Sequence, residues 1–324
     1  MSDSLSPGAD VVGLGEVMLR FSPARGRRIE NADALSVNAA GAEANVLGAL
    51  ARLGRRAALV TAFPDSPPGR RAAGELLAAG VDLAHARWIG GARMGTFYVE
   101  LGVGARVTNV WYDRAGSAFA RHVEWPSSAL RGARYAVLSG ITPALSVGAR
   151  TAALAMIKEA DQLGVPVCLD VNYRARLWSP EAAREALTAL LGHAGIVVCS
   201  ADDAVTLFDA DPDDPAAFRA RWAPRARVCA ITHGERGAVA VGDDEAIIAV
   251  DAPATEIVDR LGLGDAFLAG LLHGLLEELP LMEALRAGAA LAALKATVAG
   301  DLSLARREDL DAALARVEPS RVVR

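Results

Sequence analysis

Between residues 135 and 200, short apolar runs rich in β-branched residues alternate with longer Ala- and Leu-rich stretches. Strands that alternate with helices in this way predict parallel βαβ units. The short runs are apolar throughout, which is typical of strands that are covered on both faces. A further strand at 226–234 is followed by two turn-separated apolar runs, 238–242 and 246–250, which favour a hairpin near a sheet edge. We therefore expect an α/β fold built on a largely parallel sheet.

The first third of the chain follows a different pattern. A strand near the N-terminus leads through an Arg-rich loop into a helix at 41–54, whereas residues 95–124 carry aromatic and β-branched residues at strand-like spacing with no helical partner. This stretch indicates a small β-sheet attached to the α/β body. No internal repeat or Pro/Ser-rich linker divides the chain, so we expect one domain over 1–324, with the small sheet formed by segments near 16–40 and 92–123.

Composition and charge exclude several classes of protein. The 324 residues are 52% hydrophobic and 23% charged, which provides ample material for a globular core. A formal net charge of −5 argues against a nucleic-acid or anionic-membrane surface, and no basic and apolar leader or long apolar span is present, so we expect a cytoplasmic protein with a small-molecule partner. Cys168, Cys199 and Cys229 lie within apolar runs, which predicts buried free thiols rather than disulfides or a zinc site.

The strongest chemical signal is the segment VDRLGLGDAFLAGLLHGLLEEL at 258–279. Gly262 and Gly264 come directly before a long amphipathic helix, whose unpaired N–H groups and positive dipole end attract phosphate. Asp265 then lies at the phosphate site, where its carboxylate could accept the proton of an attacking hydroxyl group. The alternative is that Asp265 only caps the helix, since Asp is a favoured N-cap.

This segment resembles the DTxGAGD signature of ribokinase-like (PfkB) kinases, in which the last Asp is the catalytic base. The resemblance implies that Asp265 is that base and that the anion hole is formed by Gly262, Leu263 and Gly264. Arg260 replaces the common Thr and Leu263 the usual Ala, so the loop is bulkier than in relatives. The family also implies a ribokinase-like doubly wound α/β/α sandwich with a small β-sheet lid, and the use of ATP and Mg²⁺.

Two further motifs match this family. GAEANVLGALARLG resembles its GGAxxN-type motif with Ala40 in place of the first glycine, which implies that Gly41 and Asn45 contact the sugar. The turn THGERG resembles the nucleotide-binding turn of relatives. Residues implied to bind ATP are Asn172, Tyr173, Ser200, Thr232, Gly234 and Gly237. Ser200 departs from the family's Asn-x-x-Glu motif, whose acid corresponds to Asp203 here, and Asp203 either organises Mg²⁺ through water or is a plain surface acid.

Within the family, three stretches look like 2-keto-3-deoxygluconate kinases, namely WYDRAGSA, LDVNYRARLWS and ALKATVAGDLSL. With the other motifs they extend from residue 41 to residue 304, which is nearly the whole chain. Residues implied to contact the sugar acid are Tyr98, Tyr112, Arg114, Arg174 and Asp301. Arginine binds carboxylates through a planar two-pronged fork, so Arg114 and Arg174 favour an acidic substrate, unless they simply project into solvent.

The expected reaction is phosphorylation of 2-keto-3-deoxygluconate to its 6-phosphate. The alternatives are a fructokinase or another neutral-sugar kinase of the same fold, and a sugar-binding regulator without turnover. Gly13 and Gly15 do not complete a dinucleotide-binding G-x-G-x-x-G, and neither lysine of the chain lies in a P-loop. By resemblance, the lid is expected to pair subunits into a homo-oligomer. The gluconate or galactonate configuration, the oligomer size and a monovalent-cation requirement stay open.

Overall fold

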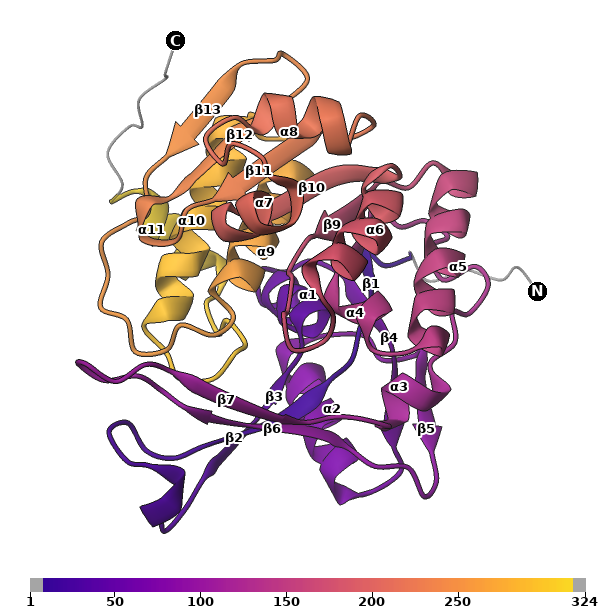
Figure 1. Cartoon of the computed structure of the whole chain (residues 1–324), viewed down its shortest axis with the longest axis vertical. Coiled ribbons are helices and arrows are strands. Elements are labelled where there is room, and N and C mark those ends of the chain that lie inside the picture. The colour runs from indigo at the N-terminus through magenta and orange to yellow at the C-terminus, as the bar shows by residue number, and fades with distance from the viewer. Residues whose placement is uncertain (1–7, 317–324) are drawn as a thin grey trace.

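The computed structural model describes residues 8–316. The prediction about a leader concerns in part the first seven residues, which lie outside this range. Its main feature is a nine-stranded sheet with strand order β13-β12-β11-β10-β9-β8-β1-β4-β5 (Figure 1). The strands of this sheet are β1 (Val11–Leu14), β4 (Ala57–Pro64), β5 (Ala86–Ile89), β8 (Tyr135–Ser139), β9 (Val167–Asp170), β10 (Ala194–Ser200), β11 (Val228–Thr232), β12 (Ala238–Val241) and β13 (Ile247–Val250).

The sheet is parallel from β5 to β11, and the β12–β13 hairpin closes one edge in antiparallel fashion. The predicted βαβ units and edge hairpin are therefore confirmed. Val11 of β1 pairs with Ala57 of β4 on one side and with Tyr135 of β8 on the other. The chain thus extends the sheet first to one side of β1 and later to the other, and a sheet of this kind opens a crevice at the carboxyl ends of its strands where the order reverses.

Helices cover both faces of this sheet. In β10, Ile196 and Val198 pack with one core cluster while Val197 and Cys199 pack with the other, which explains the uninterrupted apolar runs. The helices on the first face are α1 (Ala42–Arg52), α2 (Pro67–Ala79), α9 (Leu263–Leu276), α10 (Leu281–Ala296) and α11 (Arg307–Leu314). Those on the second are α3 (Ala118–His122), α5 (Val147–Leu163), α6 (Pro180–Leu191), α7 (Ala201–Phe208) and α8 (Pro215–Trp222), and the short α4 (Ile141–Ala144) follows β8. All three cysteines are buried free thiols, as expected.

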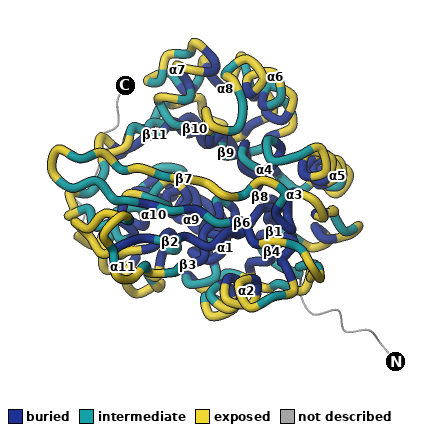
Figure 2. Tube along the Cα trace, turned by 60° about the horizontal axis from the view of Figure 1, so that its bottom comes forward, coloured by how far each residue is buried: buried dark blue, intermediate teal, exposed yellow. Residues whose placement is uncertain are grey.

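A second sheet of four strands, the lid sheet, projects from the body in the order β3-β2-β6-β7 (Figure 1). Its strands are β2 (Met18–Ser22), β3 (Ser36–Ala40), β6 (Gly95–Glu100) and β7 (Asn109–Asp113). Two predicted details need correction. Arg114 does not lie on a lid strand but directly after β7, and the end of the 92–123 segment folds as helix α3, which packs on β4 and α5 of the body. Strand β7 forms an exposed edge of the lid (Figure 2).

Local sequence explains where the site helices begin. Helix α1 starts after Gly41 and α9 after Gly262, and neither has a side-chain cap, so the first N–H groups of both helices are left for other partners. Helix α7 instead begins with Ser200, whose side chain accepts a hydrogen bond from the Asp203 N–H. Across residues 8–316, no helix combines the length and apolarity needed to cross a bilayer.

Candidate functional site

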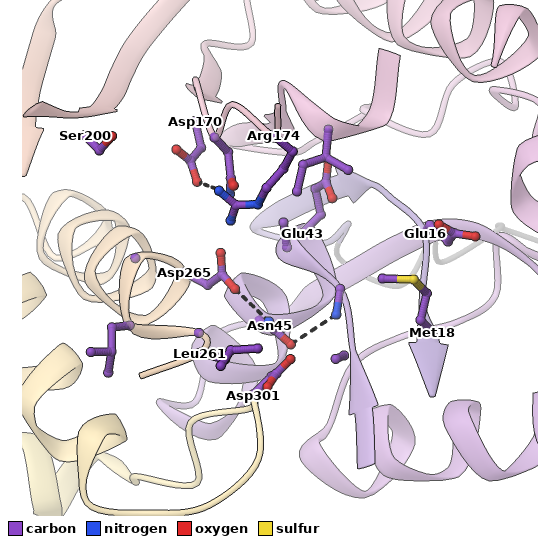
Figure 3. A pocket seen from close by; sticks show the side chains of 18 of the residues that line it. Glu16, Met18, Glu43, Asn45, Asp170, Arg174, Ser200, Leu261, Asp265 and Asp301 are labelled. Carbon is purple, nitrogen blue, oxygen red and sulfur yellow. Dashed lines mark hydrogen bonds between the residues drawn. The ribbon is translucent and has the colours of Figure 1, made fainter. Parts of the chain in front are cut away.

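A cavity of about 450 Å³ lies between the carboxyl ends of the parallel strands and the lid sheet (Figure 3). Its walls come from segments far apart in the chain. Predicted site residues that line it are Gly41, Asn45, Tyr112, Arg114, Asn172, Arg174, Ser200, Asp203, Thr232, Gly262, Leu263, Gly264, Asp265 and Asp301. Most of the residues implied by the sequence motifs therefore meet in one place, at the crevice expected for a sheet of this topology.

The beginning of helix α9 has the features of an anion-binding site, which we call the anion pocket. Gly262 has a left-handed backbone conformation (φ 80°), and a Cβ atom at this position would lie 2.2 Å from the carbonyl oxygen of Asp301, so glycine is required. The N–H of Ala266 is bound by the Gly262 carbonyl oxygen (2.9 Å), whereas the N–H groups of the three residues before it belong to the open first turn. These unpaired donors at a positive dipole end suit a phosphate group.

Asp265 is the third residue of α9 rather than its cap, so the capping alternative is wrong. Its carboxylate accepts a hydrogen bond from Asn45 Nδ2 (2.6 Å), which joins the starts of α1 and α9 (Figure 3). Burial raises the pKa of Asp265 to about 8, and the nearby Asp170 charge acts in the same direction while the Asn45 hydrogen bond opposes it. A carboxylate with such a raised pKa, next to an anion pocket, is suited to accept a proton at neutral to mildly alkaline pH.

Arg174 and a second buried acid lie across the cavity from Asp265. Burial raises the pKa of Asp170 to about 7, and its carboxylate accepts a hydrogen bond from Asn172 Nδ2 (2.8 Å). Arg174, Asp170 and Asp265 line the same cavity (Figure 3), and the charge of Arg174 lowers the pKa of both carboxyl groups. Asn172 has a left-handed backbone (φ 42°), and its buried Oδ1 has no hydrogen-bond partner among the described residues. This side chain is therefore free to bind a ligand group.

Asp203 lies in the cavity, half-buried, and accepts a hydrogen bond from the backbone N–H of Tyr173 (3.1 Å). The Tyr173 ring itself packs away from the cavity, where its hydroxyl group donates to the Trp178 carbonyl oxygen. Within residues 8–316 no group of three or more His, Cys, Asp or Glu side chains could hold a metal ion. A single carboxylate at the cavity wall, such as Asp203, suits Mg²⁺ because this ion keeps water and phosphate oxygens as most of its ligands.

A second cavity, of about 520 Å³, adjoins the first and is lined by residues between 252 and 257, by Ala side chains of α10 and by the turn after β11. Gly234 and Gly237 of the predicted nucleotide-binding turn line this cavity, and Thr232 and Gly264 line both cavities. Gly237 has φ 102°, and a Cβ there would lie 1.9 Å from the Val250 carbonyl oxygen. An apolar cavity beside an anion pocket fits a base on one side of Gly264 and phosphates at the start of α9.

Sequence reasoning missed a buried ionic network behind the anion pocket. Arg20 of β2 is 1% exposed and forms ion pairs with Asp259 (2.7 Å) and Asp301. The Asp259 carboxylate also accepts hydrogen bonds from the N–H groups of Leu261 and Gly300, both 3.1 Å. Asp259 thereby fixes the loop that carries the anion pocket. Its place as the first residue of the DRLGLGD segment was the signal that could have revealed this role.

Glu43 is a second residue that was missed. Its fully buried carboxylate accepts hydrogen bonds from Ser139 N (2.8 Å) and Thr142 Oγ1 (2.7 Å), and burial raises its pKa. These contacts tie the start of α1 to the turn after β8. A Cβ on Gly15 would lie 2.3 Å from Glu43 Oε2, and one on Gly13 would lie 2.9 Å from the Leu47 side chain. The two glycines of GLG therefore serve helix packing, not a dinucleotide.

Arg114 reaches the cavity already paired with a protein carboxylate. Its Nε donates to Glu16 Oε2 (2.8 Å), its Nη2 contacts the same oxygen, and Ser117 Oγ donates to Glu16 Oε1. Glu16 is only 4% exposed, so this pair holds the guanidinium in one orientation. Two of the Arg114 nitrogens are engaged in this way, and within residues 8–316 Nη1 is left for a ligand.

The strand alternation of β6 separates two aromatic residues. Phe97 lines the cavity. Its cross-strand neighbour on β7 is Tyr112, and the two rings stack with their centroids 5.5 Å apart. Tyr98 points to the other face of the lid sheet, where it stacks on Phe21 at 5.3 Å. The structure therefore does not bring Tyr98 to the cavity with the other predicted sugar contacts, and the aromatic residue of β6 that lies there is its neighbour Phe97.

Comparison with known proteins agrees with this arrangement. The model of the pfkB family carbohydrate kinases matches residues 9–306. The chain is 38% identical over 309 residues to the 2-dehydro-3-deoxygalactonokinase of Haloferax volcanii, covering 94% of this chain and 96% of the relative. It is 27% identical over 289 residues to probable fructokinase-3 of Arabidopsis thaliana, covering 87% and 82%.

Among solved structures, the 2-dehydro-3-deoxygluconokinase of Thermotoga maritima superposes with a TM-score of 0.83 at 30% identity, covering 94% of this chain and 99% of that one. Family model, relative and structure all extend over nearly the whole chain, and they agree with the expected fold. The chain therefore belongs to the pfkB family of carbohydrate kinases and is a sugar kinase.

Proposed function

We propose that this sugar kinase transfers the terminal phosphoryl group of ATP to the 6-hydroxyl group of 2-keto-3-deoxygluconate, with Asp265 as the general base. One observation supports this most. Asp265 is buried in the first turn of α9 and accepts a hydrogen bond from Asn45, next to Gly264, which lines both cavities.

In the proposed reaction, Asp265 accepts the proton of the substrate hydroxyl group as its oxygen forms a bond to the γ-phosphorus. The bond from that phosphorus to the bridging oxygen breaks, and ADP leaves with the electron pair. The backbone N–H groups at the start of α9 offset the charge on the transferring group. Mg²⁺, when bound, would neutralise charge on the phosphates, and Asp203 would be the carboxylate that holds it through water.

Two arginines in the cavity support an acidic substrate. Arg174 lies among carboxylates of the protein, and Arg114 has one nitrogen left by its pairing with Glu16. A keto-sugar acid would give the remaining N–H donors of these arginines an anionic acceptor, which a neutral sugar lacks. The more distant likeness to a fructokinase, at 27% identity against 38% for the 2-dehydro-3-deoxygalactonokinase, also favours the acid.

A substrate panel tests the proposal. With saturating ATP and Mg²⁺, ADP release is measured for 2-keto-3-deoxygluconate, its galactonate epimer, fructose and ribose, and the phosphorylated carbon is identified by NMR. We expect the two acids to have much the highest kcat/KM, with the product phosphorylated at carbon 6. A preference for fructose would overturn the acidic substrate, and a preference for the epimer would replace gluconate by galactonate.

The lid also supports a proposal about assembly. Strand β7 leaves one edge of the lid sheet unpaired, and Trp111 on this strand is 45% exposed. An open strand edge with an exposed aromatic residue favours pairing with a second copy of the chain. We expect a homo-oligomer by light scattering, and Trp111→Glu is expected to shift it toward monomer.

A further inference from the structure

Lys295 is one of only two lysines among the 34 lysine and arginine residues, and it is completely buried. It lies in the last turn of α10, directly behind the anion pocket, and the proposed reaction gives it no role. Burying a lysine side chain costs folding free energy unless its ammonium group has partners, so we considered which groups surround Lys295.

The surroundings of Lys295 are strongly charged. Its Nζ donates to the carbonyl oxygen of Val298 (3.3 Å), just after the end of α10, where free carbonyl groups and the dipole favour a cation. Burial lowers the pKa of Lys295 and the charge of Arg20 acts in the same direction, while Asp259 and Asp301 raise it. The residue after Lys295, Ala296, accepts hydrogen bonds from the backbone of Val258 and Asp259, so the lysine lies beside the ionic network that Arg20 forms with Asp259 and Asp301.

Charge balance explains why a second cation is needed. The two aspartates of this network carry two negative charges when ionised, and Arg20 alone compensates only one of them. An uncompensated buried charge strongly destabilises its surroundings. Lys295 brings the network to neutrality.

This network is attached to the anion pocket through the backbone. The N–H groups of Val258 and Asp259 both donate to the carbonyl oxygen of Ala296, the residue after Lys295, at 2.8 and 3.2 Å. From Asp259 the chain runs directly into Gly262, whose close approach to Asp301 was described above. A change in charge at Lys295 therefore acts on the loop that presents the anion-binding N–H groups.

We propose that Lys295 is a tethered cation that neutralises and positions the anion-pocket loop, so that turnover needs no added monovalent cation. Among residues 8–316, the oxygens around the Lys295 ammonium group leave no site for an additional monovalent ion. The Val298 carbonyl oxygen is taken by Lys295, and the oxygens of Asp259 are taken by Arg20 and two backbone N–H groups.

The experiment combines substitutions of Lys295 with a change of the monovalent cation in the buffer. Lys295→Ala opens space for an ion, Lys295→Met fills that space without charge, and Lys158→Ala changes the exposed second lysine as the matched control. Each protein is assayed in potassium chloride and in choline chloride, with whichever sugar the unaltered enzyme phosphorylates, so the choice between acid and neutral sugar does not affect the outcome. Melting temperature and ATP affinity are measured in both salts as readouts independent of turnover.

We expect the unaltered enzyme and Lys158→Ala to behave alike in both salts. Lys295→Ala should lose kcat/KM by roughly 10- to 100-fold in choline, as expected when a charge that supports an anion hole is removed, and regain most of it in potassium or ammonium. Its melting temperature should rise in potassium, whereas Lys295→Met should respond to neither salt. Potassium dependence of the unaltered enzyme would overturn the proposal, as would a salt-independent loss in Lys295→Ala or full activity of that variant in choline.

Discussion

All eight residues of β4 in the main sheet are buried, whereas four of the five residues of β7 in the lid sheet are exposed. The body side of the cavity carries Asp265 and the anion pocket, held by short contacts between buried elements. The lid side carries Phe97, Tyr112 and the start of the loop with Arg114 on a sheet with an open edge. We infer that the body performs the chemistry, and that the lid takes part in selecting the sugar.

The largest expected effect lies on the body side. Asp265→Asn keeps the shape of the side chain but removes the base, so kcat should fall by roughly 10²–10⁴ with nucleotide binding largely retained. Steady-state kinetics and calorimetric titration with ATP measure the two quantities. Turnover near that of the unaltered enzyme would rule out Asp265 as the base.

A slightly smaller loss is expected at Gly264, where a Cβ atom would meet no protein atom within 4 Å. Gly264→Val should reduce kcat/KM by roughly 10²–10³, the usual result of disturbing an anion hole, because its side chain would occupy the place of the phosphate. Gly264→Ala adds only one methyl group and improves helix propensity, so it should melt no lower than the unaltered protein and still bind ATP less well. Unchanged ATP affinity in both variants would refute the anion pocket.

On the lid side, Arg114→Ala should lower kcat/KM for the keto-sugar acid by roughly 10- to 150-fold, since a charge-assisted hydrogen bond is worth about 1.5–3 kcal/mol. The kcat/KM of Arg114→Lys should lie between those of the unaltered enzyme and Arg114→Ala, because lysine restores the charge without the planar fork.

Removing Arg114 also leaves Glu16 buried without its cation, so Glu16→Gln with Arg114→Ala is the matched control. The double variant should regain stability but not the preference for the acid. Equal losses on the acid and on fructose would mean that Arg114 only shapes the lid.

A smaller effect should separate neighbouring residues of β6. Phe97→Ala removes an aromatic ring from the cavity wall and should raise KM for the sugar by about 10-fold, as expected from roughly 1–1.5 kcal/mol for an aromatic contact. Tyr98→Ala removes a ring from the opposite face and should lower the melting temperature while leaving KM unchanged. A KM increase in Tyr98→Ala as large as that in Phe97→Ala would restore Tyr98 as a sugar contact.

The last prediction concerns pH and stability. With a pKa of about 8 in the folded protein, Asp265 keeps a proton that the unfolded chain loses near pH ~4. The folded state binds more protons within this window, so its contribution to stability falls as pH rises from about 4 to about 8. Asp265→Asn removes this pH-dependent contribution. The difference between the melting temperatures of the variant and of the unaltered protein should therefore shift in favour of the variant as pH increases. Asp33→Asn, at an exposed aspartate, is the control and should show no such trend.

Much of the body could be predicted from the sequence. Apolar runs without polar alternation predict strands covered on both faces, and glycines before an amphipathic helix predict an anion site at Gly262 and Gly264, because these signals depend only on neighbouring residues. The resemblance implied that Asn45 and Asp265 both belong to the site, and the hydrogen bond between them agrees with this. A small sheet was expected from the strand-like spacing near 95–124, but the facing of Tyr98 and Phe97 was not predicted, because a one-residue shift in a strand reverses every side chain.

By itself, the sequence determined the order of strands and helices, the edge hairpin and the anion-binding start of α9, each encoded within a short stretch. Only the tertiary structure decided which charges meet. Arg20 reaches Asp301 across 281 positions and Arg114 reaches Glu16 across 98, and no local pattern specifies such partners. Buried charges are stable only where packing brings their counter-charges within contact, so the pairing belongs to the complete fold and not to any one segment.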